Sequence, residues 1–252
     1  MIETGLVSIT FRQLNVEEVI RATVAAGLQG IEWGSDVHVP VGDLEHARRT
    51  RELTEAAGLK VFSYGSYYRA GENEDPAKAF APVLETAVVL GAPIIRVWAG
   101  AKWSWKAGEA YWDKVVADSR IICDMAAEKN IKICYEYHGW TLTDNRVSAQ
   151  DLIFSVGRDN AKLYWQPNFC LTGEDNRLAL DMLMTMVENI HCFFWNARGE
   201  RFPLEQGTEC WKEFAQLIKA DKRDHRIMVE FVCDGTPEQL VRDAEALRNI
   251  LQ

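Results

Sequence analysis

Four side chains of the kinds that bind metal ions stand in four consecutive predicted strands. Glu136 closes the fifth short apolar run of the chain, and Gln166 closes the sixth. His191 lies near the start of the seventh run, and Glu230 closes the apolar part of the eighth. Two carboxylates, one imidazole and one amide oxygen suit a divalent ion such as Mn²⁺, Mg²⁺, Co²⁺ or Zn²⁺. We therefore expect one divalent metal site formed by these four residues.

Each of these residues also has a structural interpretation. A single glutamate at a strand end is more often a partner in a salt bridge, and a single buried histidine is more often a core residue with its hydrogen bonds satisfied. Their occurrence on four neighbouring strands favours the metal site, because the carboxyl ends of parallel strands meet at one edge.

The elements that must position these residues are eight short apolar runs that alternate with longer segments of helical spacing. Asn15 is the predicted N-cap of the first helix, and Gly27, Gly58 and Gly91 stand where three helices should end. Alternation of this kind predicts parallel strands with crossover helices, and eight units predict closure. The expected fold is a closed (β/α)8 TIM barrel, with residues 1–252 as a single domain. The predicted strands are 6–10, 30–33, 59–64, 94–98, 131–136, 162–166, 190–195 and 226–231.

An open, doubly wound sheet is the rival architecture. It is disfavoured because no GxGxxG motif follows the first predicted strand.

Two further helix starts are predicted, one at Ser148 and one at the pair Thr236-Pro237.

Composition narrows the class of partner. The net charge of −9 disfavours nucleic acid, since phosphate binding depends on clusters of lysine and arginine. No apolar run approaches the roughly 20 residues of a membrane span, and the N-terminus has no secretory pattern, so we expect a cytoplasmic protein. The six cysteines contain no CxxC pair and are read as reduced packing residues. A small molecule is the expected partner, and self-association is left open.

Polar and aromatic residues at or after the strand ends are expected to line the substrate pocket. Arg96 has two interpretations, a bidentate contact to a substrate anion or an ion pair with Glu32. Tryptophans near strand ends could stack on the apolar face of a sugar ring or cover the barrel mouth. The expected substrate-binding residues are Glu32, His38, Tyr64, Arg96, His138, Asn168, Trp195 and Arg198.

Several of these segments resemble one known family over essentially the whole chain. It is the xylose-isomerase-like TIM-barrel group of sugar-phosphate isomerases, epimerases and inosose-handling enzymes, within the AP endonuclease family 2 superfamily. The resemblance implies one divalent metal held on strands five to eight by Glu, Asp, His and Glu, with Glu136 and Glu230 as the catalytic proton-transfer pair. The matching segments are Gly30-Ile31-Glu32-Trp33, Tyr135-Glu136-Tyr137-His138, Trp165-Gln166-Pro167-Asn168, Ile190-His191 and Val229-Glu230-Phe231-Val232.

The chain departs from the family pattern at Gln166, which stands where an aspartate is usual. The glutamine reduces the charge of the ligand set from −3 to −2, so we expect weaker metal binding and stronger polarisation of a substrate oxygen.

The first functional hypothesis is a metal-dependent isomerase or epimerase that acts on a sugar-derived ketone or polyol through an enediolate. The second is a keto-inositol or keto-sugar dehydratase, because the same enediolate can expel a β-hydroxyl group. A sugar-binding barrel with reduced catalysis is the non-enzymatic alternative. A phosphodiester hydrolase like endonuclease IV is disfavoured, since the five histidines of the chain are too few for a cluster of metals.

Overall fold

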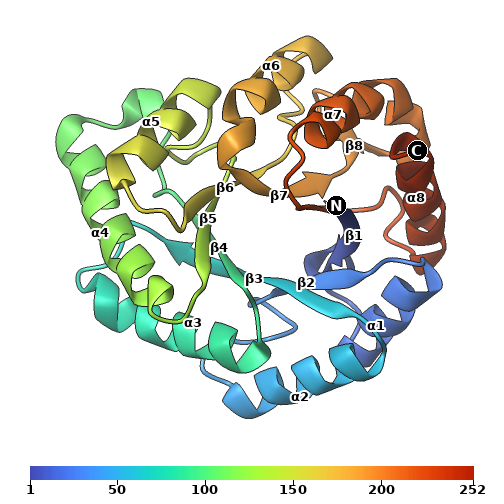
Figure 1. The fold of residues 1–252 in the computed structure, drawn as a ribbon, viewed down its shortest axis with the longest axis horizontal. Coiled ribbons are helices and arrows are strands. Elements are labelled where there is room, and N and C mark those ends of the chain that lie inside the picture. Colours follow the sequence, from blue (N-terminus) through green and yellow to red (C-terminus); the bar gives the residue numbers. More distant parts are fainter.

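The computed structural model describes residues 1–252 and shows a closed barrel of eight parallel strands ringed by helices (Figure 1). This confirms the fold predicted from the alternation of runs. The barrel closes in the order β1-β10-β7-β6-β5-β4-β3-β2. The strands are β1 (Ile2–Val7), β2 (Gly30–Gly34), β3 (Lys60–Arg69), β4 (Ile94–Trp98), β5 (Lys132–Glu136), β6 (Ala161–Trp165), β7 (Val187–Cys192) and β10 (His225–Val229).

Eight α-helices cover the outside of the barrel, one after each strand. Several begin and end where local chemistry predicts: Asn15 forms a capping box with Glu18, and Thr236 caps a helix that begins at Pro237. Gly91 ends another helix in the left-handed conformation, at φ 76°. The helices are α1 (Val16–Ala25), α2 (Leu44–Ala56), α3 (Pro76–Leu90), α4 (Glu109–Ala127), α5 (Arg146–Val156), α6 (Gly173–Leu183), α7 (Thr208–Ala220) and α8 (Pro237–Ile250).

Several predicted boundaries are wrong, among them the start of the first strand, at Ile2 rather than Leu6, and the end of the third, at Arg69 rather than Tyr64. The first strand ends at Val7 rather than at Thr10, and Ser8–Phe11 forms a 3₁₀ turn in which the Ser8 hydroxyl accepts a hydrogen bond from Gly34 N–H. The helix expected to start at Ser148 starts at Arg146, because Asn145 supplies the N-cap. The seventh strand starts at Val187, so His191 lies near its carboxyl end rather than its start.

Two apolar cores hold the barrel together. The larger core lies mainly between strands and helices, and the smaller core contains Phe62, Tyr164 and Met228. A Cβ added to Gly30 would lie 2.5 Å from the Phe62 ring, so this glycine leaves room for that ring. Burial of such rings on both sides of the sheet keeps the strand ends in fixed positions.

The chain after β7 makes a short antiparallel hairpin, β8 (Phe194–Trp195) with β9 (Arg201–Phe202), before α7. All six cysteines are free thiols. None of the helices combines the length and the apolar character needed to cross a bilayer.

Candidate metal centre and active-site pocket

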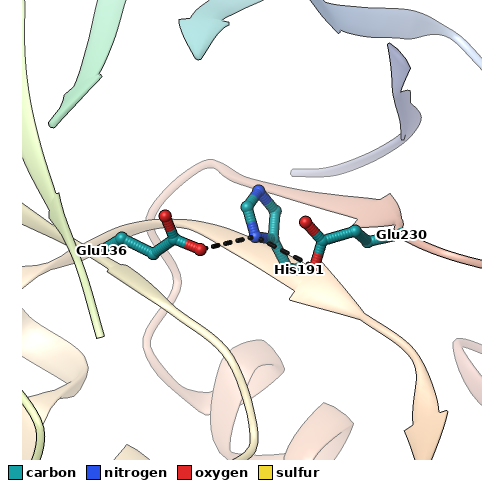
Figure 2. Close-up of side chains that lie close together, drawn as sticks. All are labelled: Glu136, His191 and Glu230. Carbon is teal, nitrogen blue, oxygen red and sulfur yellow. Dashed lines mark ion pairs between the residues drawn. The ribbon is translucent and has the colours of Figure 1, made fainter. Parts of the chain in front are cut away.

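The side chains of Glu136, His191 and Glu230 meet at the carboxyl ends of β5, β7 and β10 (Figure 2). Nδ1 of His191 lies 3.8 Å from Oε1 of Glu136 and 3.5 Å from Oε2 of Glu230. Oε1 of Gln166, just after β6, lies 3.1 Å from the same nitrogen. The donor atoms of Glu136, His191 and Glu230 all lie within 4.8 Å of one another. Donor atoms that each lie about 2 Å from one ion are roughly 3 to 4 Å apart, so this arrangement is close to that of a single-ion site.

The charges around this centre also fit a divalent cation. Three buried carboxylates, Glu32, Glu136 and Glu230, surround one buried guanidinium, Arg96. When His191 is neutral, two negative charges remain without a cation on side chains that are almost completely buried. Buried charge of this kind is costly unless it is paired, and one divalent ion would balance it.

The inner nitrogen of His191 is oriented by a carboxylate. Nε2 lies 3.4 Å from Oε2 of Glu32, and this carboxylate also accepts hydrogen bonds from Ser63 at 3.0 Å and from Nε of Arg96 at 2.8 Å. An N–H donated from Nε2 to Glu32 leaves the lone pair of Nδ1 pointing to Glu136 and Glu230. Carboxylate partners of this kind commonly fix the tautomer and the ring angle of a metal-binding histidine.

Gly65 makes room for the Glu32–Arg96 ion pair. A Cβ at this position would lie 2.7 Å from Oε1 of Glu32 and 2.8 Å from Nη2 of Arg96. Of the two interpretations of Arg96, the structure shows the ion pair with Glu32, and Arg96 also pairs with Glu136.

The two glutamates of the centre have unlike environments. Burial alone would raise the pKa of Glu136, but the Arg96 charge outweighs it and the pKa is lowered. Burial, reinforced by the neighbouring Glu136 carboxylate, raises the pKa of Glu230 despite the positive charge of His191 when that ring is protonated. Environments that push two carboxyl pKa values apart give the groups different chemical roles, with Glu136 the more firmly ionised.

Trp98 is a site residue that the sequence did not single out for this role. Its indole N–H donates to Oε2 of Glu136, the oxygen that also pairs with Nη1 of Arg96. Trp98 stands two positions after Arg96 on β4, so side-chain alternation places both on the same face. That alternation is the signal that could have identified it.

A pocket with a volume of about 770 Å³ opens above the metal centre. Glu136, Gln166 and Glu230 form part of its wall. Of the expected substrate-binding residues, four lie in the same wall: Arg96, His138, Asn168 and Trp195.

His138 is held in one orientation at the pocket wall. Its ring stacks on Trp98 with 5.3 Å between centroids and 14° between planes. Nδ1 lies 2.7 Å from the carbonyl oxygen of Gly139, a distance at which this nitrogen must donate its hydrogen. In the neutral imidazole, Nε2 is therefore an unprotonated acceptor.

The other four expected substrate-binding residues lie outside the pocket wall. Glu32 is completely buried beneath it, because it occupies the middle of β2 rather than its end. His38 is buried with Nε2 at 3.1 Å from the carbonyl oxygen of Leu14. Tyr64 packs in the larger core, where its hydroxyl donates to the carbonyl oxygen of Val39. Arg198 is exposed in the β8–β9 hairpin.

The fold and this centre define a (β/α)8 barrel with a candidate one-ion site at the carboxyl ends of its strands. The family described as xylose isomerase-like TIM barrel matches residues 20–250, and the chain belongs to this family.

Two kinds of relative are found by comparison with known proteins. A 3-dehydroshikimate dehydratase of Bacillus anthracis is 24% identical over 166 residues, which span 63% of this chain and 59% of that protein. The crystal structure of AsbF, assigned as a 3-DHS dehydratase of petrobactin synthesis in Bacillus anthracis, aligns with a TM-score of 0.83 at 20% identity, over 99% of each chain. D-Psicose 3-epimerase of Clostridium cellulolyticum H10 aligns with a TM-score of 0.71 at 14% identity, also over 99% of each chain.

Proposed function

We propose that this chain is a divalent-metal-dependent dehydratase that acts on a polyhydroxylated, sugar-like ketone. The observation that carries the proposal is the fixed His138, which lines the pocket that contains the metal centre and whose Nδ1 donates to Gly139, so that Nε2 is the acceptor in the neutral imidazole. An unprotonated imidazole nitrogen in this position can serve as a general base. Similarity to a 3-dehydroshikimate dehydratase supports the same reaction class.

The proposed elimination needs one base and one acid. Nε2 of His138 takes the proton from the carbon next to the carbonyl, and the electron pair of that bond forms the enolate. When the enolate collapses, the β-hydroxyl leaves and takes the proton back from the His138 imidazolium, which gives water and a conjugated enone. A divalent ion bound here would polarise the carbonyl and stabilise the negative charge that develops on its oxygen.

The remaining residues of the centre hold this arrangement. Arg96 and Trp98 fix Glu136, which lies as a firmly ionised carboxylate beside His191. Glu230 has no comparable hydrogen bonds from an arginine and a tryptophan. Its Oε2 lies 3.5 Å from Nδ1 of His191. The four donors Glu136, Gln166, His191 and Glu230 would hold the ion.

An isomerase or epimerase is the second candidate. It is favoured by the placement of Glu136 and Glu230 on two sides of His191, as proton transfer to two faces of a substrate requires (Figure 2). Epimerases are also among the proteins with a similar fold. In this reaction one glutamate removes a proton from the substrate and the other returns one. The product is an isomer of the substrate and no water is lost.

Product analysis distinguishes the two reactions. The Mn²⁺-loaded protein is incubated in deuterated water with a panel of keto-sugars, keto-inositols and 3-dehydroshikimate, and products are identified by mass. A dehydratase gives a product lighter by one water, and the His138→Gln variant loses this activity while its Mn²⁺ affinity, measured by calorimetry, stays within about twofold. A product that has lost no water and is heavier than the substrate because it carries deuterium, formed equally well by His138→Gln, would refute the dehydratase and support the epimerase.

A further inference from the structure

The wall of the pocket is aromatic to an unusual degree. Nine of its 21 lining residues are Phe, Trp or Tyr, whereas these types make up 10% of the chain. The volume of about 770 Å³ lies in the upper part of the range of about 300–1,000 Å³ that suits ligands of drug size. A small polyhydroxylated ketone would contact the metal centre and leave much of this aromatic surface without a partner.

Five of these rings form what we call the aromatic wall: Trp103, Trp140, Phe169, Trp195 and Phe231. Trp103 and Trp140, from the loops after β4 and β5, pack with 5.4 Å between centroids. Phe169, from the loop after β6, packs on Trp195 at 5.4 Å. Rings from several loops therefore line one cavity, and their exposed faces offer stacking surfaces.

Two rings of the aromatic wall stand on strained backbone. Trp140 has φ 59° and Phe231 has φ 53°, a region in which bulky residues are rare. Trp140 is also 64% exposed, so burial within the protein does not compensate fully for the strain. Strain of this kind concentrates at functional sites.

Both arginines of the pocket wall are already paired with carboxylates. Arg12 is paired with Asp36 at 2.6 Å, and Arg96 is paired with Glu32 and Glu136. The exposed Arg201 lies over the Phe231 ring at 4.5 Å, where it supports the ring.

From these observations we infer that the natural substrate carries a planar aromatic substituent, which stacks in the aromatic wall while the ketone lies at the metal centre. The nature of the ketone rests on the proposed function. The aromatic subsite rests on the rings and their backbone strain, and it can be tested without turnover.

Two probes that differ in one group measure the subsite. Phenyl glucoside and methyl glucoside are titrated by calorimetry into the Mn²⁺-loaded protein, because neither has a ketone that could react. The phenyl probe is expected to bind roughly tenfold more tightly through stacking on more than one ring. Equal affinities, or no binding of the phenyl probe, would overturn the inference.

Trp140→Gly is the most informative variant, because it should weaken binding of the phenyl probe without lowering the stability of the protein. Glycine removes the backbone strain, so the thermal midpoint should stay the same or rise, while the preference for the phenyl probe should fall roughly three- to tenfold. Phe169→Ala, at a side chain that is 37% exposed, should lower the same preference. Trp105→Ala is the matched control, since Trp105 is 75% exposed and does not line the pocket.

The outcomes separate this inference from the proposed function. If Trp140→Gly keeps the full phenyl preference, or if Trp105→Ala loses as much of it, the subsite is refuted even when keto-sugars are dehydrated. If the phenyl preference depends on Trp140 but no ketone of the panel reacts, the subsite stands and the dehydratase proposal fails.

Discussion

Replacement of Glu32 by glutamine tests whether this buried carboxylate prepares His191 for metal binding. Glu32 is completely buried, and it contacts Arg96, Ser63 and Nε2 of His191. Burial alone would raise the pKa of Glu32, but the Arg96 charge and His191 lower it well below its ordinary value, so the carboxylate is ionised. Glutamine keeps the size of the side chain and removes one negative charge from the centre.

Two effects of Glu32→Gln are expected. Loss of the partner that orients a metal-binding histidine typically weakens metal affinity by about 10- to 100-fold. This factor corresponds to about 1.4 to 2.7 kcal/mol. The free energy of unfolding should fall by about 3 kcal/mol, the lower end of the range for removing one partner of a buried ion pair, because Arg96 keeps Glu136.

Calorimetric titration with Mn²⁺ and denaturant unfolding of the metal-free protein measure the two effects separately. Ser63→Ala is the control, because it removes one hydrogen bond to Glu32 and keeps the charge. It should cost about 1 kcal/mol of stability and leave Mn²⁺ affinity within about twofold. If Glu32→Gln binds Mn²⁺ as tightly as the wild type, Glu32 does not prepare the site and the argument from orientation and charge is refuted.

Three further predictions concern other positions. Gln166→Asp adds a negative charge beside Nδ1 of His191, so Mn²⁺ affinity should rise and turnover fall; unchanged affinity in calorimetry would show that Gln166 is not a ligand. Burial lowers the pKa of His38, so its neutral form stabilises the fold above the ordinary histidine pKa of about 6.5, and that contribution is lost as the pH falls. The wild type should therefore lose more stability than His38→Gln between about pH 7.5 and about pH 5, and parallel thermal-unfolding profiles would contradict this. Gly65→Ala should cost about 1 to 3 kcal/mol in urea unfolding, because its Cβ would lie 2.7 Å from Glu32; wild-type stability would show that the ion pair can shift without cost.

Some predictions failed because sequence patterns describe side-chain type better than backbone path. Residues 8–10 are predicted as strand because they continue an apolar and β-branched run, yet Ser8–Phe11 forms a 3₁₀ turn at the mouth of the barrel. The seventh strand begins at Val187, earlier than predicted. The prediction starts it too late because Glu188 and Asn189 are polar and interrupt the apolar run. The Asn189 amide is satisfied inside the barrel by the Tyr164 hydroxyl at 2.8 Å, a contact that no local pattern reveals.

The sequence by itself determined the alternation of strands and helices, the barrel they form, and the strand-end positions of Glu136, Gln166 and Glu230, because these follow from spacing along one segment at a time. Only the tertiary structure decided what each polar group touches. From the sequence, Arg96 could bind a substrate anion or form an ion pair with a neighbouring acid. Packing across β2, β4 and β5 places it in ion pairs with Glu32 and Glu136. The reason is that the distance between two side chains on different strands depends on the register and closure of the whole barrel, whereas spacing along one strand does not.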